Sequence, residues 1–158
     1  MTIVDLIRTF AEPLTMAVVM TDVDLERPGP TILYTNPAFA RMSGYTAAQV
    51  LGASPRLLQG PGTAMQHTRL IARRLRAEGR FHGVLQNYRR SGEAYLCEID
   101  VRPLLNGGGE TLAFLAFERE VVRRRGRPSS NDPHGRYRPV VPELLDVGAM
   151  CAAPSLFG

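Results

Sequence analysis

Residues 44–60 read GYTAAQVLGASPRLLQG, and the rest of the chain is organised around this stretch. A threonine placed before helix-forming residues accepts hydrogen bonds from the first free backbone N–H groups, so Thr46 predicts a short helix over Tyr45 to Leu51. Gly52 ends that helix, and Pro55 opens or bends the next turn. The stretch therefore indicates two short helical turns bounded by glycines.

Two polar side chains of this stretch point to a possible binding site. Arg56 and Gln59 lie three residues apart, which places them on one side of a short helix. A guanidinium can fork onto a phosphate, and an amide offers both donors and an acceptor. The pair is thus suited to one polar ligand, while a solvated arginine and a surface glutamine are the alternative.

The residues before this stretch indicate two strands and a helix. The runs Met16 to Asp22 and Ile32 to Thr35 are rich in β-branched residues and predict strands. Asn36 is placed to cap the helix that follows, and Pro37 suits its first position.

The residues after it indicate a longer helix and three further strands. Apolar residues at helical spacing predict a helix over about residues 64–77. Strands are predicted over 81–88, 94–104 and 111–118, with turns at 89–93 and 106–109. The chain then has five strands, with the helices gathered between the second and the third.

The two ends differ from this central part. Residues 2–12 carry apolar side chains at helical spacing up to Pro13, which predicts an amphipathic helix that serves as a lid on the sheet or as a dimer contact. From residue 123 the chain is rich in Arg, Pro, Ser and Gly, which predicts a flexible linker and a loose tail. The expected division is a flanking helix at 1–13, one domain at 14–122 and a basic tail at 123–158.

Composition and charge indicate which partners and which compartment this chain suits. The chain has 158 residues, of which 44% are hydrophobic, and a formal net charge of +4. No run approaches the roughly 20 apolar residues that cross a bilayer, so no membrane partner is expected. The arginines are scattered rather than arranged in a binding stripe, so no nucleic-acid partner is expected either. Two cysteines do not form a disulfide framework and suit a reducing cytoplasm.

Two motifs resemble those of a known family. Residues 52–60 resemble the flavin-binding signature G-x-N-C-R-[FL]-L-Q-G of LOV domains, the blue-light branch of the PAS superfamily, and match it at both glycines, Arg56, Leu58 and Gln59. Asn87 begins the stretch NYRRSG, which is similar to the family's N-Y-x-K-x-G. The resemblance covers roughly residues 17–121. It implies an α+β PAS fold, in which a five-stranded antiparallel sheet carries helices gathered on one face.

The resemblance also implies a cofactor, FMN, and a set of residues around it. Arg56 would take the phosphate, and Gln59 and Asn87 would bind the polar edge of the isoalloxazine. The family's photoactive cysteine falls on Pro55, which has no nucleophile, so the flavin–cysteine adduct cannot form there.

Other family positions have changed as well. Ser54 stands for the usual asparagine of the signature, and Cys97 for a second asparagine, where a small buried hydrophobe is the expected state. A second phosphate-binding arginine falls on Ala72, for which Arg69 or Arg73 could substitute.

The signalling glutamine of the last strand falls on Glu118. An ionised carboxylate beside a flavin carbonyl is repulsive, so Glu118 would have to be protonated or turned away. Burial raises the pKa of a carboxyl group and favours the protonated form.

Two hypotheses follow. The first is a LOV-like sensor that binds flavin without covalent attachment and signals light or redox state through dimer or partner contacts, made by the helix over residues 2–12 and the sheet face. The second is a cofactor-free PAS module for protein interaction or dimerisation, with its cavity closed around side chains. An enzyme is not expected, because no catalytic constellation is evident. His67 and His82 stand alone, so no metal site is expected.

Overall fold

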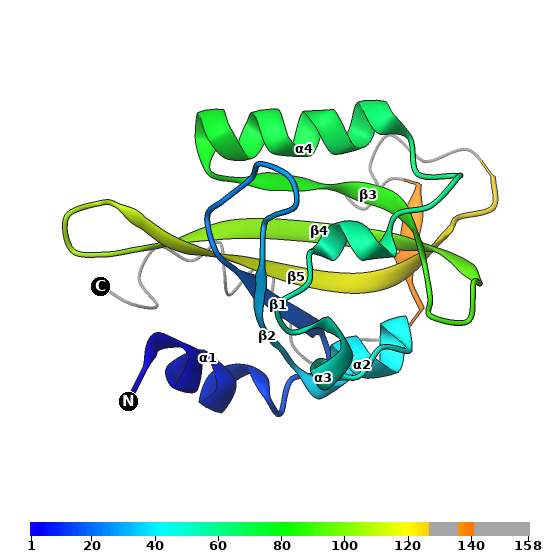
Figure 1. The fold of residues 1–158 in the computed structure, drawn as a ribbon. Coiled ribbons are helices and arrows are strands. Elements are labelled where there is room, and N and C mark those ends of the chain that lie inside the picture. Colours follow the sequence, from blue (N-terminus) through cyan, green and yellow to red (C-terminus); the bar gives the residue numbers. More distant parts are fainter. Residues whose placement is uncertain (127–135, 141–158) are drawn as a thin grey trace.

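The computed structural model describes residues 1–126 and 136–140 of the chain. The helical elements are α1 (Ile3–Ala11), α2 (Pro37–Ser43), α3 (Ala47–Val50), the 3-10 helix η1 (Pro55–Leu58) and α4 (Met65–Glu78). The strands are β1 (Ala17–Thr21), β2 (Ile32–Thr35), β3 (Phe81–Tyr88), β4 (Ala94–Leu105), β5 (Thr111–Arg123) and β6 (Tyr137–Pro139). The five longer strands form one antiparallel sheet in the order β2-β1-β5-β4-β3 (Figure 1).

Local sequence signals place the helices where the sequence predicts them. Asn36 caps α2 by accepting a hydrogen bond from the backbone N–H of Phe39 at 3.1 Å, and Pro37 occupies its first turn. Thr46 caps α3 in a capping box with Gln49. Pro55 opens η1. These contacts join residues two or three apart, which is why the sequence alone locates them.

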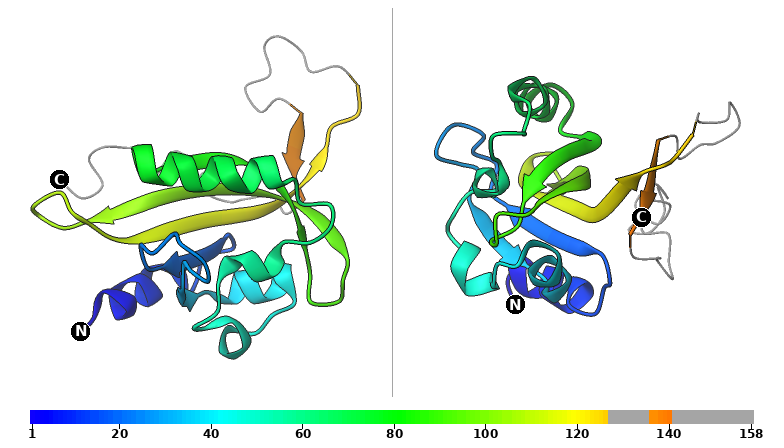
Figure 2. Two further views of the ribbon diagram at one scale, coloured as in Figure 1. Left: turned by 45° about the horizontal axis from the view of Figure 1, so that its top comes forward. Right: turned by 90° about the vertical axis from the view of Figure 1, so that its right-hand side faces the viewer.

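The sheet carries helices on both of its faces (Figure 2). Side chains alternate along each strand, so β1 directs Ala17 and Val19 to the inner face and Val18 and Met20 to the outer face. Helices α2, α3, η1 and α4 pack on the inner face, as the α+β PAS fold requires. Helix α1 packs on the outer face.

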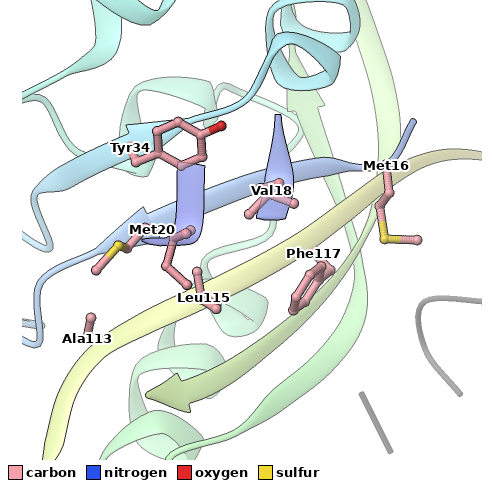
Figure 3. Close-up of a cluster of buried hydrophobic side chains, with 9 residues drawn as sticks. Met16, Val18, Met20, Tyr34, Ala113, Leu115 and Phe117 are labelled. Atoms are coloured by element: carbon pink, nitrogen blue, oxygen red, sulfur yellow. The ribbon is translucent and has the colours of Figure 1, made fainter. Parts of the chain in front are cut away.

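Helix α1 is a lid over the outer face, which confirms that alternative. Ile7 and Ala11 of α1 pack against a cluster formed by residue 16 and strands β1, β2 and β5. Figure 3 labels the other members of this cluster, which are Met16, Val18, Met20, Tyr34, Ala113, Leu115 and Phe117. Burial of each large side chain stabilises the fold by roughly 1.5–3 kcal/mol. In addition, the hydroxyl of Tyr34 donates a hydrogen bond of 2.7 Å to Glu12, at the end of α1.

The predicted count of five strands and the predicted extent of the linker need correction. Strand β5 continues to Arg123, beyond the predicted end at Glu118, and β6 pairs with its last three residues. Strand β1 leaves this part of the β5 edge unpaired because its own pairing ends at Glu118. Part of the predicted linker is therefore a sixth strand. The rest of the predicted tail, 127–135 and 141–158, lies outside the described residues.

Candidate functional site

A cavity of about 120 Å³ lies between the inner sheet face and the helices η1 and α4. Most of its lining is apolar. The strongly polar side chains in the lining are Arg56, Gln59, Asn87 and Glu118, and Pro55 also borders the cavity. The structure thus brings together four of the predicted polar side chains, from η1, β3, β5 and the residue after η1.

An open groove of about 580 Å³ adjoins the cavity. The two share Leu25, Arg56, Gln59, Thr68 and Ala72 in their linings. The arginines of the groove are Arg27, Arg56, Arg69 and Arg76, and its lining also contains one carboxylate, Glu26. The groove is therefore a site of positive potential that opens from the cavity to solvent.

Of the two arginines predicted to replace the missing phosphate-binding arginine, one lines this groove and the other does not. Arg69 lies in its lining, whereas Arg73 is exposed on α4 and is absent from the linings of both the cavity and the groove. The second arginine that α4 contributes to the groove is Arg76. It lies seven residues, or two turns, after Arg69 and therefore on the same side of the helix. This spacing was readable from the sequence. Arg27, from the loop between β1 and β2, carries no comparable signal.

Arg56 is held by the loop between β1 and β2. Its Nε donates to the carbonyl oxygen of Gly29 at 2.8 Å, and its Nη2 donates to that of Leu25 at 3.0 Å. Partial burial lowers the pKa of Arg56, and the neighbouring charges of Arg27 and Arg76 lower it further. Arg56 therefore joins the loop to η1 at the boundary between cavity and groove.

Two predicted contacts are not part of the cavity lining. Ser54 caps η1 instead, since its Oγ accepts a hydrogen bond of 3.3 Å from the backbone N–H of Arg56. Cys97 is fully buried opposite Leu85, with its Sγ 3.8 Å from the carbonyl oxygen of Glu98. Burial raises the pKa of the Cys97 thiol. Cys97 is thus a small buried hydrophobe, the state that the sequence favours.

Glu118 is the most unusual side chain of the site. Its side chain is 4% exposed, and its Oε2 is buried without a hydrogen-bond partner. Burial raises the pKa of Glu118 to about 7. The hydroxyl of Tyr95, on neighbouring strand β4, is also buried without a hydrogen-bond partner. The inner sheet face therefore carries polar groups that the protein itself leaves unpaired.

Neither a metal site nor a membrane-spanning helix is found among the described residues. Within residues 1–126 and 136–140, no three His, Cys, Asp or Glu side chains are grouped so as to hold a metal ion. In the same residues, no helix has the length and apolar character needed to cross a membrane.

Residues 15–122 match the family described as PAS domain. The chain belongs to the PAS domain family. It is 36% identical over 113 residues to a nitrogen fixation regulatory protein of Klebsiella oxytoca, covering 72% of this chain and 22% of that protein. It is 31% identical over 122 residues to a blue-light-activated histidine kinase of Brucella anthropi, covering 74% of this chain and 25% of that kinase. The chain thus spans about a quarter of the length of these relatives.

Solved structures of LOV domains resemble this PAS domain. The LOV domain of the Erythrobacter litoralis EL346 blue-light activated histidine kinase superposes with a TM-score of 0.60 at 25% identity, over 68% of this chain and 95% of that domain. The D109G variant of RsLOV gives a TM-score of 0.66 at 29% identity, over 81% of this chain and 70% of that one. The PAS domain described here is therefore LOV-like.

Proposed function

We propose that this PAS domain is a sensor module that binds a flavin, FMN, without a covalent bond. The observation that carries the proposal is the buried, unpartnered Oε2 of Glu118 in a cavity that also presents Gln59 and Asn87. An unsatisfied buried polar group costs about 1–3 kcal/mol. A ligand with a polar edge would remove that cost by supplying the missing hydrogen bond.

The residues present suit the parts of a flavin mononucleotide. Gln59 and Asn87 offer amide donors and acceptors for the polar edge of the ring. Arg56 and Arg69, joined by Arg27 and Arg76 in the groove, offer charge for a phosphate. When bound, the flavin would supply blue-light absorption and redox chemistry. Because Pro55 carries no nucleophile, the response would be a non-covalent one that alters dimer or partner contacts.

The volume of the cavity favours a second candidate, a cofactor-free PAS interaction module. A cavity of about 150 Å³ holds a single benzene ring, and the cavity here measures about 120 Å³. A three-ring flavin would therefore displace lining side chains or extend into the groove. In the cofactor-free alternative, the domain serves only to bind proteins, and we propose no catalytic activity for the domain in either case.

An absorption spectrum separates the two candidates. The freshly purified protein would be measured directly, and again after FMN is added and unbound FMN is removed by desalting. A structured blue band that survives desalting supports the flavin sensor. A featureless visible spectrum in both samples contradicts it and leaves the cofactor-free module.

We further propose that the domain forms a homodimer through α1 and the adjoining sheet face. Ile3, Leu6 and Phe10 form an exposed apolar stripe along α1 beside the buried Ile7, and they are 40%, 57% and 42% exposed. Light scattering during size-exclusion chromatography gives the test. The double variant Leu6→Lys with Phe10→Lys should be monomeric and folded, and a wild-type monomer at all concentrations would contradict the proposal.

The proposed compartment is the cytoplasm. Cys97 is a free thiol within the described residues, and it is buried. A thiol in this state is compatible with a reducing compartment.

A further inference from the structure

Besides the cavity and the groove, a third space of about 410 Å³, here called the hollow, opens beside β5 between the segments that pair with β1 and with β6. Strand β1 pairs with β5 only up to Glu118, and β6 begins to pair at Val121. The lining of the hollow includes Ala17, Ala38, Met42, Arg89, Glu118 and Glu120.

Glu118 borders this hollow and the cavity at once. Among the described residues, it alone belongs to both linings. The side chain is nevertheless 4% exposed, and its Oε2 has no hydrogen-bond partner. A single buried residue that carries a carboxyl group therefore lies between an apolar cavity and a hollow with a charged rim.

We propose that Glu118 exchanges its proton with solvent through this hollow and so carries protons between solvent and whatever occupies the cavity. On the hollow side, a hydronium ion gives a proton to the carboxylate: its O–H bond breaks, water remains, and a carboxyl O–H bond forms. On the cavity side, that O–H bond breaks as the proton passes to a basic atom of the ligand, where a new bond to hydrogen forms, and the carboxylate is then protonated again from the hollow. One proton moves in each cycle, and no other bond changes.

The lining of the hollow supports this route. Ala17, the register partner of Glu118, and Ala38 of α2 have small side chains that leave the approach open. Arg89 on the rim already donates to the carbonyl oxygen of Met42 at 2.6 Å and to Glu120 at 2.7 Å. Its charge is thus engaged by other acceptors, and Glu118 remains able to take up a proton.

Burial, and not the neighbouring charges, brings the pKa of Glu118 close to neutral pH. Burial raises the pKa of Glu118 to about 7, the range in which a proton is easily gained and lost. The titratable and charged groups on the elements packed around it are Tyr95 and Cys97 on β4, Glu120 and Arg119 on β5, Arg41 on α2, Arg89 after β3 and Arg56 on η1.

Infrared spectroscopy of the protein without added ligand tests the inference. The C=O stretch of a protonated carboxyl group would be assigned to Glu118 by its absence in Glu118→Gln. Rapid mixing with D₂O would then time the shift of this band. Ala38→Leu fills the hollow, and Ala116→Val is the matched control because Ala116 lines only the cavity. Ala17→Val is a second plug in case Ala38→Leu does not fold.

We expect fast exchange in the wild type and in Ala116→Val, and exchange slowed by an order of magnitude or more in the plugged variants. Slower exchange in Ala116→Val but not in the plugged variants would place the proton route through the cavity and overturn the inference. The inference would also be overturned if no carboxyl band assigned to Glu118 changed with pH. The experiment needs no flavin, so its failure is distinguishable from failure of the proposed flavin site.

Discussion

Arg56 holds the carbonyl oxygen of Gly29 with its Nε at 2.8 Å, across 27 residues of sequence. A second hydrogen bond from Nη2 to the carbonyl oxygen of Leu25 makes the contact a two-point brace. The side chain that the sequence assigns to a ligand phosphate therefore also holds the loop at the mouth of the cavity.

Replacing Arg56 should consequently affect both stability and ligand preference. Arg56→Ala should lower the free energy of unfolding by about 1–3 kcal/mol, because a charged donor and two carbonyl acceptors lose their partners. It should also weaken binding of FMN more than binding of riboflavin, which lacks the phosphate. Urea unfolding and ligand titration measure these effects. Arg73→Ala, on the exposed side of α4, is the control and should stay within about 0.5 kcal/mol of wild type. Equal losses in both variants would contradict the brace.

Asn36 connects three elements and should be a key residue for stability. Its Nδ2 donates to the carbonyl oxygens of Ala11 and Met16 at 3.0 and 2.9 Å, while its Oδ1 accepts from the backbone N–H groups of Val18 and Phe39. Asn36→Ala would remove all four of these hydrogen bonds. The Ala11 carbonyl would keep the N–H of Leu14 and the Phe39 N–H would keep the backbone oxygen of residue 36, so the buried groups that lose this partner outright are the Val18 N–H and the Met16 carbonyl. The free energy of unfolding should fall by about 2–4 kcal/mol.

Asn106→Ala is the matched control for this prediction. The side chain of Asn106 accepts from the backbone N–H groups of Gly108 and Glu110 in an exposed turn, where water can replace it. Its loss should cost about 1 kcal/mol or less. Chemical denaturation compares the two variants, and similar losses would show that the buried position of Asn36 does not matter.

Glu118 should make the domain less stable as pH rises. Its pKa is about 7 in the folded protein, against 4.5 as the ordinary value. Between these values the folded state binds a proton that the unfolded state has released, so stability falls with rising pH and levels off above about 7. The total change corresponds to about 3 kcal/mol.

Urea unfolding at about pH 5 and about pH 8 measures this dependence. Glu118→Gln should remove that part of the pH dependence, because the amide does not titrate. Its stability near neutral pH should equal or exceed that of wild type. The same slope in wild type and variant would assign the effect to other groups.

Pro55→Cys tests the position of the missing nucleophile. Pro55 borders the cavity at the start of η1, so a cysteine there would place a thiol beside the proposed flavin. With FMN bound, illumination of Pro55→Cys should remove the blue absorption band, and the band should return in the dark. Pro55→Ser has no thiol and should show no such cycle. A light-stable blue band in both variants would mean that the ring does not lie beside residue 55.

The sequence by itself determined the features that depend on neighbouring residues. Helix caps and first-turn prolines act over two or three residues, and they are found where the sequence predicts them. The caps are Asn36 and Thr46, and the prolines are Pro37 and Pro55. The predicted bounds of β2 and β3 coincide with those observed, because alternation and turn residues mark them. The family resemblance of residues 52–60 also needed only the order of residues.

Tertiary structure decided what depends on distant backbones. Strand β6 forms because the pairing of β1 with β5 ends at Glu118 of β5 and leaves the edge of β5 beyond that residue open. The sequence of residues 137–139 contains no local pattern that predicts this pairing. The spacing in the sequence places Arg69 and Arg76 on one side of α4, but the packing of α4 on the sheet decides that this side, and not the side of Arg73, faces the groove.

The state of Glu118 was decided in the same way. The sequence shows that residue 118 is a glutamate. Its unpaired Oε2 and its position between the cavity and the hollow depend on which side chains other strands and helices direct toward it. Desolvation depends on the density of surrounding atoms in space, and sequence separation carries no information about that density.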